Sequence, residues 1–153
     1  MKISKIIKTK ALPSFCTSNI DVIYSIISYC KYYRLPCLIE CTSNQVNQHG
    51  GYTKKTPKKF IDEIFKIAKN IKFEKKNIIL GGDHLGPLPW KNVINRVALK
   101  NSIELINKFV TLKFAKIHID TSIKCKDDKI INNDIILKRT ERILNHPKIK
   151  KKI

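Results

Sequence analysis

Short apolar runs alternate along this chain with longer segments whose apolar residues recur at helical spacing. Runs of four to six residues that are bounded by polar or turn residues are typical of buried strands, and spacing of three and four residues predicts helices. The predicted strands are residues 12–17, 36–41, 77–80 and 115–120. The predicted helices are residues 20–34, a segment beginning at 57, residues 92–112 and residues 134–144.

The order of these elements is strand, helix, repeated four times. Strands that alternate with helices favour a parallel sheet, because parallel strands need a crossover connection. Two helix starts carry their own signals. Asn19 or Ser18 precedes the first helix as a cap, and Thr56 followed by Pro57 is a strong start for the second. The sequence therefore predicts an α/β fold of about four βα units.

Length and charge set the domain organisation. The 153 residues suffice for one domain. We divide them into a basic arm at 1–10, a folded domain at 11–145 and a tail at 146–153 that is mostly Lys and Ile. The arm is not followed by the apolar stretch of a targeting signal, and no segment is apolar and long enough to cross a membrane.

The formal charge is +19, from 31 Lys and Arg against 12 Asp and Glu. Only four of the cations are Arg, the residue that reads phosphates and bases bidentately, and the lysines are scattered. We therefore expect no specific nucleic-acid partner and no membrane partner, only weak binding to polyanions. Five Cys without a C-x-x-C pair predict reduced thiols and a cytoplasmic protein.

Three successive predicted strands end at or near a carboxylate: Glu40, Asp83 and Asp120. Ligand sites of parallel α/β sheets lie at the carboxyl ends of the strands, so we expect these three side chains to meet at one edge. The alternative is that each acid merely caps the next helix. His118 lies two residues before Asp120 and shares its side of the strand, as a ligand or as a core histidine.

Two neighbouring segments add chemistry. Asp83-His84 sits between Gly82 and Gly86, where the backbone can turn sharply. The loop at 42–52 is rich in amides, including Asn44 and Gln45, which could bind a polyol or a phosphate or simply satisfy the turn. The sequence contains no G-x-G-x-x-G, Walker A or G-x-S-x-G motif, which disfavours dinucleotide, NTP and hydrolase sites.

These segments resemble the GatZ/KbaZ family, the Z subunits of bacterial D-tagatose-1,6-bisphosphate aldolase. The resemblance is carried by residues 38–48, 50–53, 79–87 with Trp90, and 116–120, with a weaker match at 13–17. It implies a cytosolic (β/α)8 TIM barrel, of which residues 11–145 would be the N-terminal half. The family would make the chain an accessory subunit of the Y chain, a zinc class II aldolase that cleaves tagatose 1,6-bisphosphate into glycerone phosphate and glyceraldehyde 3-phosphate.

The resemblance also implies roles for individual residues. Class II aldolases have an Asp-His pair at the end of the third strand, so Asp83 would act as proton donor and His84 as ligand of a divalent metal such as zinc. We take Glu40 and Asp120 as further catalytic candidates. Asn44, Gln45 and His118 are substrate-binding candidates.

Three functions remain open from the sequence. The first is a truncated, non-catalytic accessory subunit that supports the Y chain in galactitol, tagatose or N-acetylgalactosamine catabolism. The second is a metal-assisted epimerase or aldolase acting on tagatose 6-phosphate or a sugar acid. The third is a non-specific binder of polyanions.

Overall fold

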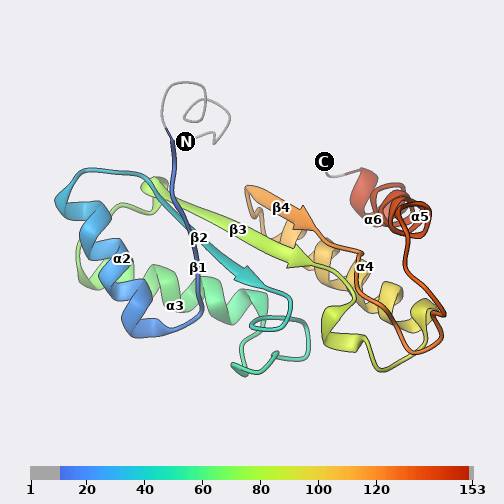
Figure 1. Ribbon diagram of the computed structural model, residues 1–153. Coiled ribbons are helices and arrows are strands. Elements are labelled where there is room, and N and C mark those ends of the chain that lie inside the picture. The colour runs from blue at the N-terminus through green and yellow to red at the C-terminus, as the bar shows by residue number, and fades with distance from the viewer. Residues whose placement is uncertain (1–10, 152–153) are drawn as a thin grey trace.

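The computed structural model describes residues 11–151 and confirms the predicted α/β architecture (Figure 1). Four strands form one sheet in the order β1-β2-β3-β4, and every neighbouring pair is parallel. The strands are β1 (Ser14–Cys16), β2 (Cys37–Thr42), β3 (Ile78–Leu85) and β4 (Lys116–Ile119). A sheet in chain order with one helix after each strand is compatible with part of a (β/α)8 barrel.

The crossover helices are α2 (Ile20–Tyr32), α3 (Pro57–Asn70) and α4 (Asn95–Thr111). Two more helices follow the last strand, α5 (Asn133–Leu144) and α6 (Pro147–Lys150). Short 3-10 turns, η1 (Lys75–Asn77) and η2 (Leu88–Trp90), flank β3. In Figure 1, α2, α3 and α4 run along one side of the sheet, and α5 and α6 lie beyond α4.

The helix starts follow the predicted caps. The Asn19 side chain accepts hydrogen bonds from the N–H groups of Asp21 and Val22, and Thr56 accepts one from Lys59 with Pro57 at the first helical position. These bonds satisfy N–H groups that have no partner within the first turn.

The core lies between the sheet and its helices. Buried apolar side chains from all three crossover helices meet those of β2 and β3. The largest fully buried apolar side chains are Ile23, Ile27, Ile39, Phe60, Ile64, Leu85, Leu105, Ile106, Phe109, Ile143 and Ile149. The helix-facing side of β2 is therefore apolar at alternate positions, which leaves its other side for polar groups.

Two segments differ from the sequence expectation. β3 continues past the expected end at Leu80 as far as Leu85, so that the two glycines, Asp83 and His84 belong to the strand and not to a loop. The segment after residue 145 contains α6, with His146 at its N-cap and Ile149 buried. Within residues 11–151, no helix is long and apolar enough to span a bilayer.

Candidate functional site

The register of the sheet sets out a row of side chains across all four strands. Cys16 pairs with Glu40, Glu40 with Gly81, and Gly81 with Lys116. Partners in a parallel ladder project to the same face, and so do residues two apart on one strand. Asp83 and His118 therefore share this face, each two residues further along its strand.

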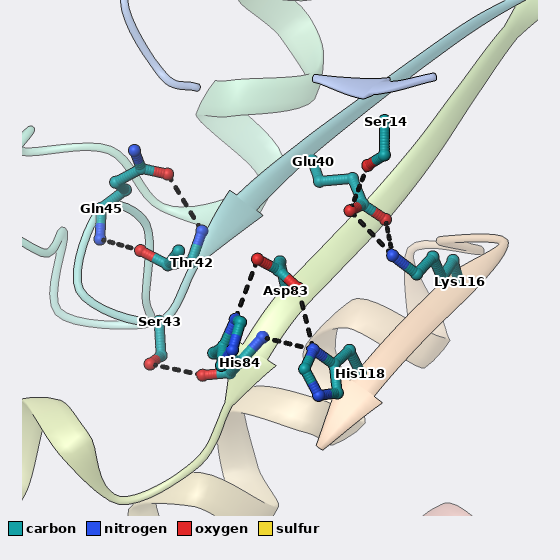
Figure 2. Close-up of polar contacts among 9 residues, drawn as sticks. All are labelled: Ser14, Glu40, Thr42, Ser43, Gln45, Asp83, His84, Lys116 and His118. Atoms are coloured by element: carbon teal, nitrogen blue, oxygen red, sulfur yellow. Dashed lines mark hydrogen bonds and ion pairs between the residues drawn. The ribbon is translucent and has the colours of Figure 1, made fainter. Parts of the chain in front are cut away.

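Glu40 is the buried centre of that row. Its side chain is only 2% exposed, and it accepts a hydrogen bond from the Ser14 hydroxyl on β1 (Figure 2). Lys116 Nζ on β4 lies 2.9 Å from each carboxylate oxygen. An ideal Cβ on Gly81 would stand 2.2 Å from Glu40 Oε1, so the absent side chain makes room for the carboxylate. Three strands are thereby tied together across a glycine.

A β-bulge brings His84 to the same face as Asp83. The register between β3 and β4 shifts between Gly82 and Leu85, and His84 has a left-handed backbone with φ of 48°. Adjacent residues on a regular strand point to opposite faces, but a bulge re-aims one of them. The His84 carbonyl accepts a hydrogen bond of 3.0 Å from the Ser43 hydroxyl, which anchors the bulge to the loop after β2.

Asp83 links the two histidines of the cluster. Its Oδ2 lies 2.9 Å from His84 Nδ1 and its Oδ1 lies 2.8 Å from His118 Nδ1, with the two ring centroids 4.4 Å apart (Figure 2). Burial alone would raise the pKa of Asp83, but hydrogen bonds from His118 and His84 outweigh it and hold that pKa below its usual range. Asp83 is therefore a carboxylate that orients both rings.

The donor set of this cluster suits a divalent metal. One potential ligand atom from each of Asp83, His84 and His118 lies within 4.8 Å of the others. Two imidazoles and a carboxylate are ligands that zinc and other first-row divalent ions accept. His84 is 53% exposed, His118 44% and Asp83 19%, so the cluster is open to ligands from solvent.

Asp120 lies near the cluster, but its carboxylate is engaged elsewhere. Its Oδ1 accepts hydrogen bonds from the Ser122 N–H at 2.9 Å and hydroxyl at 2.6 Å. Burial alone would raise the pKa of Asp120, but the hydrogen bonds from Ser122 and the charges of His84 and His118 outweigh it and lower that pKa. The Asp120 N–H donates a hydrogen bond of 3.1 Å to the Leu85 carbonyl, which holds its backbone beside the end of β3.

The three predicted acids thus do not occupy equivalent positions. Asp83 and Asp120 lie by the histidines, whereas Glu40 pairs with Gly81 two residues before Asp83 and is buried. The reason is that β2 continues to Thr42, so Glu40 lies inside the strand and not at the end of the strand.

The amide-rich loop carries two of the three substrate-binding candidates, Asn44 and Gln45, and they have different surroundings. Gln45 Oε1 accepts a hydrogen bond of 3.0 Å from the Thr42 N–H, so this side chain stabilises its own turn. Asn44 lines a shallow hollow of about 330 Å³ together with Tyr52 and Trp90. The lining of this hollow includes none of Asp83, His84 and His118.

Two residues that the sequence did not single out as site residues also belong to this face. Lys116 is the partner of Glu40. Partial desolvation, together with the charge and hydrogen bond of Asp83, raises the pKa of the Cys16 thiol to about 11. Period-two spacing from His118 back to Lys116 is the signal that could have indicated the lysine.

Comparison with known proteins relates the chain to a protein family and to a solved structure. The model of a family described as "D-tagatose-1,6-bisphosphate aldolase subunit GatZ/KbaZ-like" matches residues 1–150. A crystal structure of a protein described as a probable tagatose 6 phosphate kinase from Sinorhizobium meliloti 1021 superposes with a TM-score of 0.83 and 37% sequence identity. That alignment covers 88% of this chain and 35% of the other, so the chain spans about a third of its structural relative.

Proposed function

This chain belongs to the GatZ/KbaZ-like family, and we propose from this membership that it acts in tagatose catabolism as an accessory chain of a D-tagatose-1,6-bisphosphate aldolase. The partner would be the class II aldolase Y chain, and the compartment the cytoplasm. The observation that carries the proposal is the family match over residues 1–150, whose description names an aldolase subunit.

Two observations support this proposal. The cross-strand lock formed by Ser14, Glu40 and Lys116 stabilises the sheet without exposing its carboxylate to a substrate. The name of the structural relative also refers to a tagatose phosphate, which fits the same pathway.

Co-purification with a class II tagatose-bisphosphate aldolase tests the proposal. The tagged chain should retain the aldolase on a column and raise the aldolase's thermal midpoint, because a partner that binds only the native state stabilises it. The aldolase alone and the aldolase with an unrelated basic protein are the controls. Equal midpoints in all three samples would refute the accessory role.

A second function is favoured by the Asp83–His84–His118 cluster: metal-assisted chemistry on a sugar phosphate such as tagatose 6-phosphate. His84 and His118 would hold the metal, and Asp83 would orient both rings through Nδ1. A bound divalent ion supplies polarisation of a substrate carbonyl. Asp120 would move a proton, and Asn44 would bind a hydroxyl group of the sugar.

Zinc titration against a chromogenic chelator tests this second function without requiring turnover. We expect His84→Ala or His118→Ala to weaken zinc binding at least about tenfold. His146→Ala is the matched control, because His146 is outside the cluster and caps α6. Turnover of tagatose 6-phosphate that disappears in Asp83→Ala would support the catalytic step. Zinc affinity that is unchanged in both cluster variants would exclude the site.

The two functions make different predictions for one variant. If the chain acts only by docking, Asp83→Ala should leave retention of the aldolase unchanged, because docking does not require the chemistry of the cluster. The same variant should abolish turnover if the cluster is catalytic. A single preparation assayed both ways therefore separates the accessory role from the enzymatic one.

A further inference from the structure

A second concave site lies away from the strand ends, between α4, α5 and α6. It is a hollow of about 560 Å³, and it is lined by Arg96, Val97, Lys100, Asn101, Ile103, Glu104, Arg142, His146 and Lys148. We refer to it as the α4–α6 basic pocket. Its volume falls in the range of sites for small organic ligands.

The charges around this pocket are unbalanced. Four cations line it, two from α4 and one each from α5 and α6, against the single carboxylate of Glu104. None of the four forms an ion pair with another residue in the part of the chain that the structure describes. Like charges gathered from three helices repel one another, so an anion in the pocket would lower the free energy of the folded state.

The lining combines apolar and cationic groups. Ile103 is buried, whereas Val97 and the four Arg and Lys residues are exposed. α6 packs on the rest of the chain through the buried Ile149, and His146 caps it by accepting a hydrogen bond of 3.3 Å from the Lys148 N–H. A lining that combines apolar side chains with guanidinium and ammonium donors suits an organic anion whose phosphoryl oxygens can accept several hydrogen bonds.

We propose that the α4–α6 basic pocket binds a multiply charged organic phosphate. The pocket does not include any residue of the Asp83–His84–His118 cluster, so the proposal stands apart from the function assigned to the strand ends. Arg96 and Arg142 provide bidentate donors from two helices, and Lys100 and Lys148 add charge.

Calorimetric titration at constant ionic strength tests the proposal, with inorganic pyrophosphate and fructose 1,6-bisphosphate as probes. We expect the Arg96→Gln/Arg142→Gln double variant to bind both probes about tenfold more weakly or worse. Lys66→Gln/Lys69→Gln is the matched control, because it removes the same charge from exposed positions on α3, outside the pocket. The control should bind as the unmodified chain does.

Amide chemical-shift mapping on the unmodified chain keeps the test independent of whether the double variant folds. Shifts concentrated at Val97, Asn101 and His146 on adding pyrophosphate would support the pocket. Shifts spread over the lysines, shifts centred on His84 and His118, or equal weakening in both double variants would overturn it.

Discussion

Replacing Gly81 by alanine should destabilise the protein only while Glu40 is present. An alanine Cβ at this position would lie 2.2 Å from Glu40 Oε1 and 2.8 Å from its Cγ, whereas ordinary contact begins near 3.4 Å. The glutamate side chain would have to move by about 1 Å. It is buried and bound to Ser14 and Lys116, so moving it weakens the cross-strand lock.

The size of the effect follows from these contacts. Overpacking together with partial loss of the ion pair should cost about 2–4 kcal/mol in Gly81→Ala. Glu40→Ala should cost less than about 2 kcal/mol, because Lys116 is 39% exposed and can be solvated when its partner is removed. In the Glu40→Ala background the new methyl group enters vacated space, and alanine replaces a flexible glycine in a strand. Gly81→Ala should then be neutral or stabilising by up to about 1 kcal/mol.

Urea unfolding followed by the fluorescence of Trp90 and by circular dichroism measures all four free energies of the cycle. The coupling energy between the two sites should be at least about 2 kcal/mol, with a change of sign for Gly81→Ala. Additive effects would show that the glycine is not there to accommodate the carboxylate. Equal slopes against urea in the four variants are the control for a common unfolded state.

Two further predictions concern the segment after β4. Burial alone would raise the pKa of Asp128, but the ion pair with Arg139 Nη2 at 2.5 Å and the hydrogen bond from the Cys125 N–H lower it. The contribution of Asp128 to stability is therefore present above the unfolded pKa of about 3.9 and is lost as pH falls through the lower native pKa. Unfolding free energies measured from pH 6 to pH 2.5 should therefore fall more steeply for the unmodified chain than for Asp128→Asn, and parallel curves would contradict the pairing. Ile149→Ala should cost about 2–4 kcal/mol by thermal or urea unfolding if α6 is packed in the core, whereas a loss below about 0.5 kcal/mol would mean that it is not.

Local and periodic signals in the sequence predicted the frame of this molecule. The alternation of apolar runs with helical spacing gave four βα units, and the parallel sheet followed because parallel strands require crossovers. Asn19 and Thr56 were identifiable as caps because a short polar side chain just before a helix can accept hydrogen bonds from the free N–H groups of its first turn. These features depend on neighbours within a few residues.

The details of the site depend on register, which the sequence does not carry locally. Asp83 and His84 are adjacent, so regular alternation would put them on opposite faces, and only the bulge brings both to one side. The pairing of Glu40 with Lys116 joins residues 76 positions apart through the alignment of three strands. The burial of Ile149 was hidden because a run of Lys and Ile after a helix is also the pattern of an exposed tail.

The same face of the sheet thus carries two polar groups that differ in exposure, and exposure decides what each can do. Glu40 is almost completely buried beside a glycine that no larger residue can replace without strain, so its carboxylate holds strands together and is closed to a ligand. His84 and His118 are about half exposed, and Asp83 orients their rings through Nδ1, so each Nε2 is a potential metal ligand. Five described non-glycine residues have a positive φ, and His84 is the one that lies within a strand. On this face of the sheet, exposure therefore favours the cluster over the buried pair as a ligand site, in line with the second function proposed above.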